Sequence, residues 1–433
     1  MERKPIRTSD CKEIKPHKIT LNEIIREKGH DFVKAYHGSL TAWQIKNLTA
    51  IADCRTAAYG GRIEECDECG ERYILYNSCR NRHCPQCQTI TTNQWLDARR
   101  SELLPCNYFH IVFTLPDKLN KIIYANQEKC YSLFFHAVSE TIKILSEDKR
   151  YLGFLPGFIA ILHTWSQTLF FHPHMHCLMT AGGLDINNQW LETNGKFFAH
   201  IDVMSIIFKR IFTRELKSLC RKHELNIIER DEIKKFYKTV KIAGRQQWIV
   251  FSKPLLENIN AVLEYFGRYT HRVAISNYRI LSMKDNIVTF RWKDYKHNSR
   301  KKIMPLEVSE FLHRFSMHIL PKRFVKIRYY GLFNKQKQKC YRKIILKQIE
   351  LIDSINYNKQ MQAIEKQHNL PDEKTKDVQE DIQEKFIITE NRDLIKCPSC
   401  KKGRLIKIME IEPIKYKRKN RKKFRAPPEK IIS

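Results

Sequence analysis

Several familiar signatures are absent from this 433-residue chain, and each absence removes a class of function. There is no Walker-type phosphate loop and no glycine-rich dinucleotide fingerprint, so neither nucleotide-driven nor nicotinamide-dependent chemistry is predicted. No internal repeat is present. The N-terminal residues are charged and lack the apolar segment of a signal peptide. We therefore expect a cytoplasmic protein whose 14 clustered cysteines are reduced and available to bind metal.

Acidic residues are also few for a chain this rich in basic ones. There are 47 Asp and Glu against 78 Lys and Arg, which leaves a net charge of +31 and a pI near 9.6. Solubility alone does not require so large an excess of one sign. The balance favours a polyanionic partner, with nucleic acid first and an anionic membrane second.

Charged residues are missing altogether from residues 151–184, although 29% of the chain is charged. The stretch is long enough to span a membrane, but it contains Pro156, His163 and Gln167. Strands buried on both faces also read as continuous apolar runs. We therefore expect no membrane span but two buried strands, FIAILHTWSQ and HPHMHCLMT, joined by a turn near Phe170–Pro173.

The second of these expected strands carries a candidate metal site. Alternate residues of a strand point to one face, so His174 and His176 should project side by side. Two imidazoles can begin a site for a divalent metal. The preceding strand offers a third ligand, either Gln167, which we favour because it lies nearer the turn, or His163. His172 should lie at the turn and out of range.

Two Cys-x-x-Cys knuckles in one short segment predict a closed structural zinc site. The four cysteines of this predicted site are Cys66, Cys69, Cys84 and Cys87. Cys79 and His83 lie between the knuckles and are alternatives that could replace a knuckle cysteine or bind a second ion. Arg80 and Arg82 would place a basic surface beside the zinc, suited to contacts with the DNA backbone.

A later segment, residues 255–272, reads as an amphipathic helix with two tyrosines on one face. Tyr265 and Tyr269 are four residues apart and so lie close together, near Arg268 and Arg272. Tyrosine pairs at this spacing are usually core or rim residues. Beside a metal site they have a chemical meaning: the metal polarises a phosphate, a tyrosine oxygen attacks it, and cationic groups stabilise the charge.

The C-terminal region differs in composition from the rest. Cys397 and Cys400 form a lone knuckle with no evident second half, and a basic tail follows it. We divide the chain into a basic N-terminal arm (1–40), a zinc-binding DNA-recognition domain (41–100), a catalytic domain (101–345) and a charged C-terminal region (346–433).

Taken in order, six segments within roughly residues 35–335 resemble one known family. They are YNSCRNRHCPQCQ, HIVFTLP, LHTWSQTLFFHPHMHCLMTAGG, YFGRYTHRVAISNYR, VTFRWKDY and RFVKIRYYG. In order and spacing they resemble the HUH-type, two-tyrosine transposases of rolling-circle insertion sequences, which carry an N-terminal zinc-binding domain. The resemblance implies an α+β fold: a Rep- or relaxase-like core with a central antiparallel sheet and flanking helices, preceded by a small zinc-binding domain.

The resemblance also implies roles for particular residues. Phe113–Leu115 matches the first Rep motif, His174 and His176 match the metal pair, and Tyr265 and Tyr269 match the nucleophiles. Such a protein would use Mg²⁺ or Mn²⁺ for catalysis and Zn²⁺ for structure. It would nick single-stranded DNA at element ends through a 5′-phosphotyrosine intermediate, and it would rejoin strands at a target. Its expected partners are this DNA and the host replication machinery, at the bacterial nucleoid and with no membrane.

Other functions stay open from the residues alone. A zinc-dependent DNA-binding protein without catalysis would need neither the histidines nor the tyrosines. A metal-dependent nuclease that activates water would use the histidines and form no covalent adduct. A replication initiator or plasmid relaxase would share the nicking chemistry, and only the zinc module and overall layout favour the transposase.

Overall fold

The structure is a computed structural model that describes residues 12–13, 19–88, 102–193, 199–227, 229–255, 262, 267, 272–294, 297, 299–364 and 396–414. Within residues 352–364 it describes the backbone alone.

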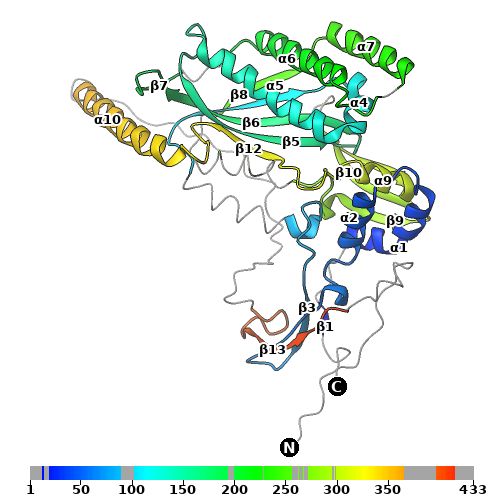
Figure 1. Cartoon of the computed structure of the whole chain (residues 1–433). Coiled ribbons are helices and arrows are strands. Elements are labelled where there is room, and N and C mark those ends of the chain that lie inside the picture. The colour runs from blue at the N-terminus through cyan, green and yellow to red at the C-terminus, as the bar shows by residue number, and fades with distance from the viewer. Residues whose placement is uncertain are drawn as a thin grey trace, which may run out of the picture.

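The largest element is a six-stranded antiparallel sheet (Figure 1). Its strands follow the spatial order β12-β5-β6-β4-β8, with β7 beside β6. Their bounds are β4 Tyr108–Thr114, β5 Leu155–Trp165, β6 Phe171–Leu184, β7 Trp190–Glu192, β8 Val250–Leu255 and β12 Ile327–Gly331. The strands β5 and β6 form the predicted hairpin, although its turn covers Ser166–Phe170, slightly earlier than expected.

Helices cover one face of this sheet and bury the larger core. They are η3 Asp117–Leu119, α4 Asn120–Ala125, α5 Gln127–Glu147, α6 Ile201–Arg221 and α7 Arg230–Arg245. Phe113 on β4, Met175 on β6 and Phe208 on α6 are fully buried in this core. The opposite face has a separate apolar cluster, which includes Ile161, Leu178 and Ile345 of the helix α10 Gln338–Ile364.

A second layered unit lies beside the sheet. Its helices are α1 Leu21–Ala35, α2 Ala42–Ala52 and α9 Val308–Ser316. Its three-stranded sheet has the order β11-β10-β9, formed by β9 Ile280–Lys284, β10 Ile287–Asp294 and β11 Arg300–Glu307, with η4 Asn277–Arg279 before it. Both N-terminal helices begin with capping boxes, at Thr20 and Thr41, which satisfy the first backbone N–H groups.

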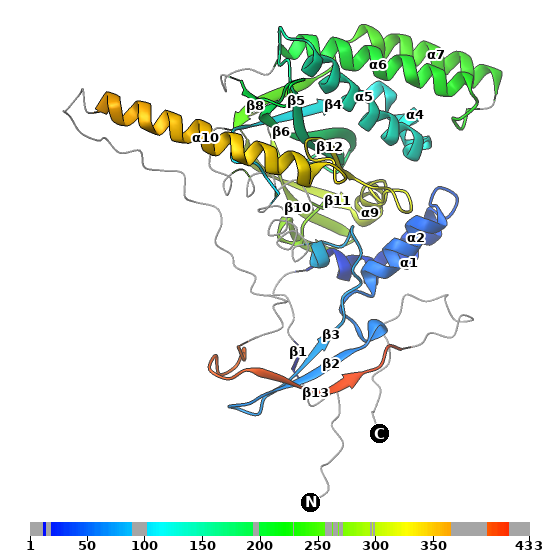
Figure 2. The ribbon, with the colours of Figure 1, turned by 60° about the vertical axis from the view of Figure 1, so that its left-hand side comes forward.

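The two ends of the described chain meet in a small four-stranded sheet of order β1-β3-β2-β13 (Figure 2). Its elements are β1 Lys12–Glu13, β2 Gly61–Cys66, β3 Arg72–Tyr76 and β13 Leu405–Ile411, with η2 Ala57–Tyr59 before β2. The sequence did not predict this meeting of β13 with β2.

The prediction of an α+β fold with antiparallel sheets and flanking helices is confirmed. Among the described residues, no helix is both long and apolar enough to cross a lipid bilayer. The domain boundaries stay predictions, although β13 of the expected C-terminal region pairs with β2 of the expected zinc-binding domain.

Candidate functional site

Three histidines converge on the middle of the large sheet. One ring nitrogen from each of His163, His174 and His176 lies within 4.8 Å of the other two. The hairpin register explains this arrangement, because His163 pairs directly with His174, and His176 is two residues further along β6. Three imidazoles at this spacing can hold one divalent metal ion.

Strand alternation separates this site from the main core. The side chains of Leu162 and Met175 enter the helix-covered core, so the histidines point to the other face, where Ile161 and Leu178 are buried. The large core therefore fixes the two strands from behind, while the three ring nitrogens face away from α5 and α6.

His174 and His176 are held as neutral bases, which is the form that binds metal. Burial lowers the pKa of His174 to about 4, although the hydrogen bond to the His172 carbonyl acts in the opposite direction. Burial also holds the pKa of His176 well below its usual value, and the neighbouring His163 and His174 add to this effect. These two ligands therefore need no deprotonation at neutral pH.

A fourth histidine, His110 on the neighbouring strand β4, contacts the site from the same face of the sheet. Its Nε2 lies 2.9 Å from Nδ1 of His176, and both rings are buried. If His176 binds a metal through Nε2, its Nδ1–H must donate to His110. His174 Nδ1 lies 2.8 Å from the His172 carbonyl and donates to it, which leaves Nε2 as the metal-binding atom. The sequence interpretation missed His110; its only signal was a histidine on the neighbouring strand.

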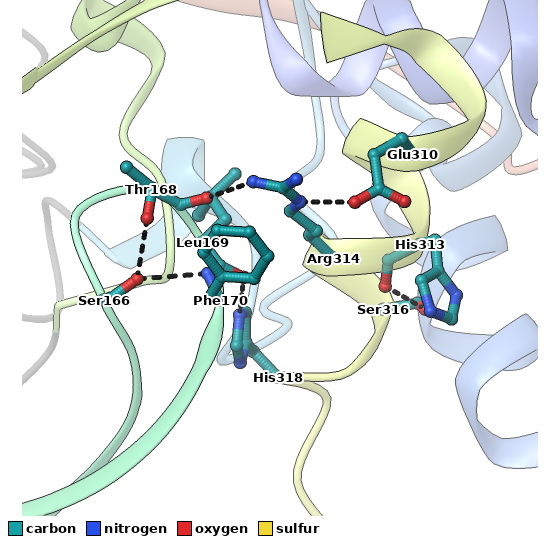
Figure 3. Close-up of polar contacts among 9 residues, drawn as sticks. All are labelled: Ser166, Thr168, Leu169, Phe170, Glu310, His313, Arg314, Ser316 and His318. Atoms are coloured by element: carbon teal, nitrogen blue, oxygen red, sulfur yellow. Dashed lines mark hydrogen bonds and ion pairs between the residues drawn. The ribbon is translucent and has the colours of Figure 1, made fainter. Parts of the chain in front are cut away.

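The turn that joins the two histidine strands is fixed by α9 and the residues after it (Figure 3). Arg314 donates to the Thr168 carbonyl at 3.0 Å, forms an ion pair with Glu310, and lies 3.9 Å above the Phe170 ring. His318 Nε2 donates to the Leu169 carbonyl at 2.9 Å. The second layered unit thus positions the hairpin that carries the metal ligands.

The two candidates for a third ligand occupy different places. His163 lies within the histidine cluster, whereas Gln167 lies in the turn beyond the end of β5, where its backbone carbonyl accepts a hydrogen bond from Arg279. This geometry favours His163 over Gln167. His172 lies outside the cluster, as expected, although it is on β6 rather than in the turn, with Nδ1 3.6 Å from Asp117.

Tyr265, Tyr269 and Arg268 lie outside the described residues, so their roles stay predictions. Two described positions bracket their segment. Val262 is buried in the apolar cluster on the histidine face of the sheet, and the charge of Arg272 acts on both His174 and His176.

The first cysteine cluster differs from the predicted zinc site. Cys54, Cys79, Cys84 and Cys87 bring their sulfur atoms within 4.8 Å of one another, with Cys87 Sγ 3.7 Å from Cys54 Sγ and 3.6 Å from Cys79 Sγ. Cys79, weighed as an alternative ligand, is in the cluster. Cys54 was not considered, although it is a cysteine shortly before the knuckles.

The second cluster contains Cys66, Cys69, Cys397 and Cys400. The prediction that the two N-terminal knuckles share one ion was therefore wrong. Strands β2 and β3 separate them: Cys66 and Cys69 lie at one end of this hairpin and Cys79 follows the other end. A strand of five residues spans about 17 Å, far more than one zinc site. The interpretation of Cys397 and Cys400 as a knuckle without a second half was also wrong.

Two further residues near the knuckles, His83 and Arg82, make structural contacts. His83 accepts a hydrogen bond from the Leu320 amide at 3.3 Å and is outside both cysteine clusters. Arg82 donates to the carbonyls of Pro321 and Phe324, so its guanidinium ties the zinc-binding segment to the chain after α9. Arg80 is exposed and stays a candidate for DNA contact.

The fold and its sites define an α+β protein that combines a three-histidine centre with clustered cysteine sites. Residues 24–115 match the family model described as "Transposase zinc-binding domain", and residues 157–340 match the model described as "Putative transposase". The chain belongs to this family of insertion-sequence transposases with an N-terminal zinc-binding domain, which confirms the resemblance.

Two relatives extend the similarity over most of the chain. The chain is 39% identical over 394 residues to "Putative transposase y4qJ" of Sinorhizobium fredii (strain NBRC 101917 / NGR234), which covers 89% of this chain and 94% of the relative. It is 29% identical over 300 residues to "Transposase for insertion sequence element IS801" of Pseudomonas savastanoi pv. phaseolicola, covering 68% and 71%. No solved structure matches the chain.

Proposed function

We propose that this transposase nicks single-stranded DNA at the ends of its insertion sequence by tyrosine attack and later rejoins the strands. The observation that carries the proposal is the convergence of His163, His174 and His176 in an antiparallel sheet, within the region that matches the transposase family model. In the nicking step, a tyrosine oxygen forms a bond to phosphorus and the bond from phosphorus to the 3′ oxygen breaks. The tyrosine loses its proton, and the 3′ oxygen gains one.

A metal at the three histidines would act as a Lewis acid on the scissile phosphate. Three imidazoles fit a divalent transition metal, whereas Mg²⁺ prefers oxygen ligands. We therefore propose Mn²⁺ as the better-bound of the two expected ions. His163, His174 and His176 would hold it, and His110 would orient the His176 ring.

The nucleophiles would be Tyr265 and Tyr269. Their segment begins near Val262, which is buried on the histidine face, and ends at Arg272, whose charge acts on the metal ligands. Both boundaries of the segment are thus on the side of the sheet where the phosphate would bind. A tyrosine at its ordinary pKa of about 10 is a weak nucleophile, so it gains most from a polarised phosphate and nearby cations.

Strand joining would need no nucleotide cofactor, because the tyrosyl phosphate ester retains the energy of the broken bond. The nick would leave a free 3′ hydroxyl, which the host replication machinery could extend. The zinc-binding domain, with Arg80 exposed, and the charge of +31 would contribute DNA contacts that weaken as salt rises.

The decisive test uses the full-length protein, Mn²⁺ and a single-stranded oligonucleotide that carries the element's own terminus. With the label at the 3′ end, tyrosine attack gives a labelled protein–DNA adduct that survives boiling in detergent. With the label at the 5′ end, it gives a shorter strand that a polymerase can extend. The double variant Tyr265→Phe/Tyr269→Phe should form no adduct, whereas Tyr278→Phe, which changes an exposed tyrosine outside the site, should behave as wild type.

Other outcomes separate the alternative functions. Cleavage without an adduct would show hydrolysis by water and overturn the role of the tyrosines. Binding without cleavage in the presence of Mn²⁺ would support a DNA-binding protein without catalysis. The third metal ligand is assigned by comparing His163→Ala with Gln167→Ala; we expect only the former to weaken Mn²⁺ binding, by tenfold or more as an order-of-magnitude estimate.

A further inference from the structure

The second cysteine cluster joins residues from the two ends of the chain. Cys66 Sγ lies 3.7 Å from Cys400 Sγ, and Cys69 Sγ lies 3.7 Å from Cys397 Sγ. Four sulfur atoms around one zinc, each about 2.3 Å from it in a tetrahedron, are separated by about 3.8 Å. The observed separations therefore match a tetrahedral site with four thiolate ligands.

The two halves of the cluster have the same local backbone. In each, the residue after the second cysteine has a positive φ: 68° at Gly70 and 59° at Lys401. Each also closes a turn with a backbone hydrogen bond, from Gly70 N to the Cys66 carbonyl at 3.0 Å and from Lys401 N to the Cys397 carbonyl at 2.8 Å. Two matching knuckles that face each other are the usual construction of a zinc ribbon.

Contacts that do not involve the sulfur atoms also hold the two knuckles together. The Asp67 amide donates to the Arg404 carbonyl at 3.1 Å, and the Arg404 amide donates to Asp67 Oδ1 at 2.6 Å. A Cβ atom at Gly403 would lie only 2.4 Å from Cys66 Sγ, so the approach of the two knuckles requires glycine there. Strand β13 then pairs with β2 from Cys66 to Gly61.

We propose that a second zinc ion binds to Cys66, Cys69, Cys397 and Cys400 of one chain and clamps the C-terminal segment to the N-terminal domain. The family model for the zinc-binding domain matches residues 24–115, so Cys397 and Cys400 lie outside it. The proposal concerns a structural site and does not depend on the nicking reaction.

The clamp has a consequence for the basic tail. Residues 405–411 run along β2 toward the first cysteine cluster, and the Ile414 amide donates to the Ala57 carbonyl at 3.3 Å. The tail that follows Ile414 is rich in lysine and arginine. The second zinc ion therefore fixes Ile414, the last described residue before this tail, beside the segment that contains Cys54.

Zinc content provides the first test. Purified full-length wild type and variants are compared by elemental analysis after exchange into buffer free of added metal. We expect both Cys66→Ser/Cys69→Ser and Cys397→Ser/Cys400→Ser to contain one zinc per chain less than wild type. Cys340→Ser, which changes an exposed cysteine outside both clusters, should keep the wild-type content. Unchanged zinc content in the Cys397→Ser/Cys400→Ser variant would overturn the proposal.

Hydrogen exchange tests the clamp itself and shows whether the variants remain folded. In Cys66→Ser/Cys69→Ser, the amides of residues 405–411 should exchange faster by about tenfold or more, because zinc sites of this kind contribute strongly to local folding. Exchange in α5 and β6 should not change. Wild-type protection at 405–411 in this variant would overturn the clamp.

A mixing experiment tests whether the site forms within one chain. The two double-serine variants are combined, and the zinc content is measured again. If the site forms in one chain, the mixture should contain no more zinc than the separate variants. Recovery of the missing zinc would show that two chains exchange their C-terminal segments and would overturn a site within one chain.

Discussion

The hydrogen bond between His110 and His176 gives the sharpest quantitative prediction about the proposed metal centre. In His110→Leu, the Nδ1–H of His176, which is buried, loses its acceptor at 2.9 Å. Loss of such an outer-shell partner typically costs 10- to 100-fold in metal affinity. This corresponds to roughly 1.4–2.7 kcal/mol of binding free energy. His110→Gln should retain most of the affinity, because its side-chain oxygen can accept the same hydrogen bond.

The assay measures Mn²⁺ binding to the full-length protein whose cysteine sites already hold zinc. Binding is monitored by electron paramagnetic resonance, in which the signal of free Mn²⁺ disappears as the ion binds. His136→Leu is the matched control, since it removes an exposed histidine of α5 that is outside the cluster. If His110→Leu binds Mn²⁺ as tightly as wild type, the inferred tautomer of His176 is wrong. Equal weakening by His110→Leu and His110→Gln would show that ring packing, rather than the hydrogen bond, supports the site.

Two further predictions concern stability and the second cysteine cluster. Burial lowers the pKa of His318 to about 4 in the folded protein. As the pH falls below about 6.5, this histidine is therefore protonated in the unfolded chain before it is protonated in the folded protein. Protonation of this histidine in the unfolded chain should therefore lower the free energy of unfolding by about 3 kcal/mol at pH 4. In His318→Gln, urea denaturation should show a smaller loss of stability at acid pH. An identical pH dependence in both proteins would contradict this. Gly403→Ala should weaken zinc binding at the second cluster, as measured by competition with a chelating dye. Gly38→Ala, whose new Cβ would meet no atom within 4 Å, should not.

Local sequence patterns determined much of this protein. The uncharged stretch was long enough for two strands, and strand alternation placed His174 and His176 on one face, as the structure shows. Cysteine spacing identified the Cys-x-x-Cys knuckles. These features succeed because they depend on residues that are close in the chain, where backbone geometry leaves few alternatives.

The choice of partners for those residues required the tertiary structure. His163 joins the cluster because the hairpin turns earlier than expected, which places His163 directly opposite His174. His110 reaches His176 only because β4 pairs with β6. A Cys-x-x-Cys turn has the same local geometry whichever second knuckle it faces. The pairing of Cys66 and Cys69 with Cys397 and Cys400 is therefore decided by the β2–β13 contact, which spacing along the chain does not reveal.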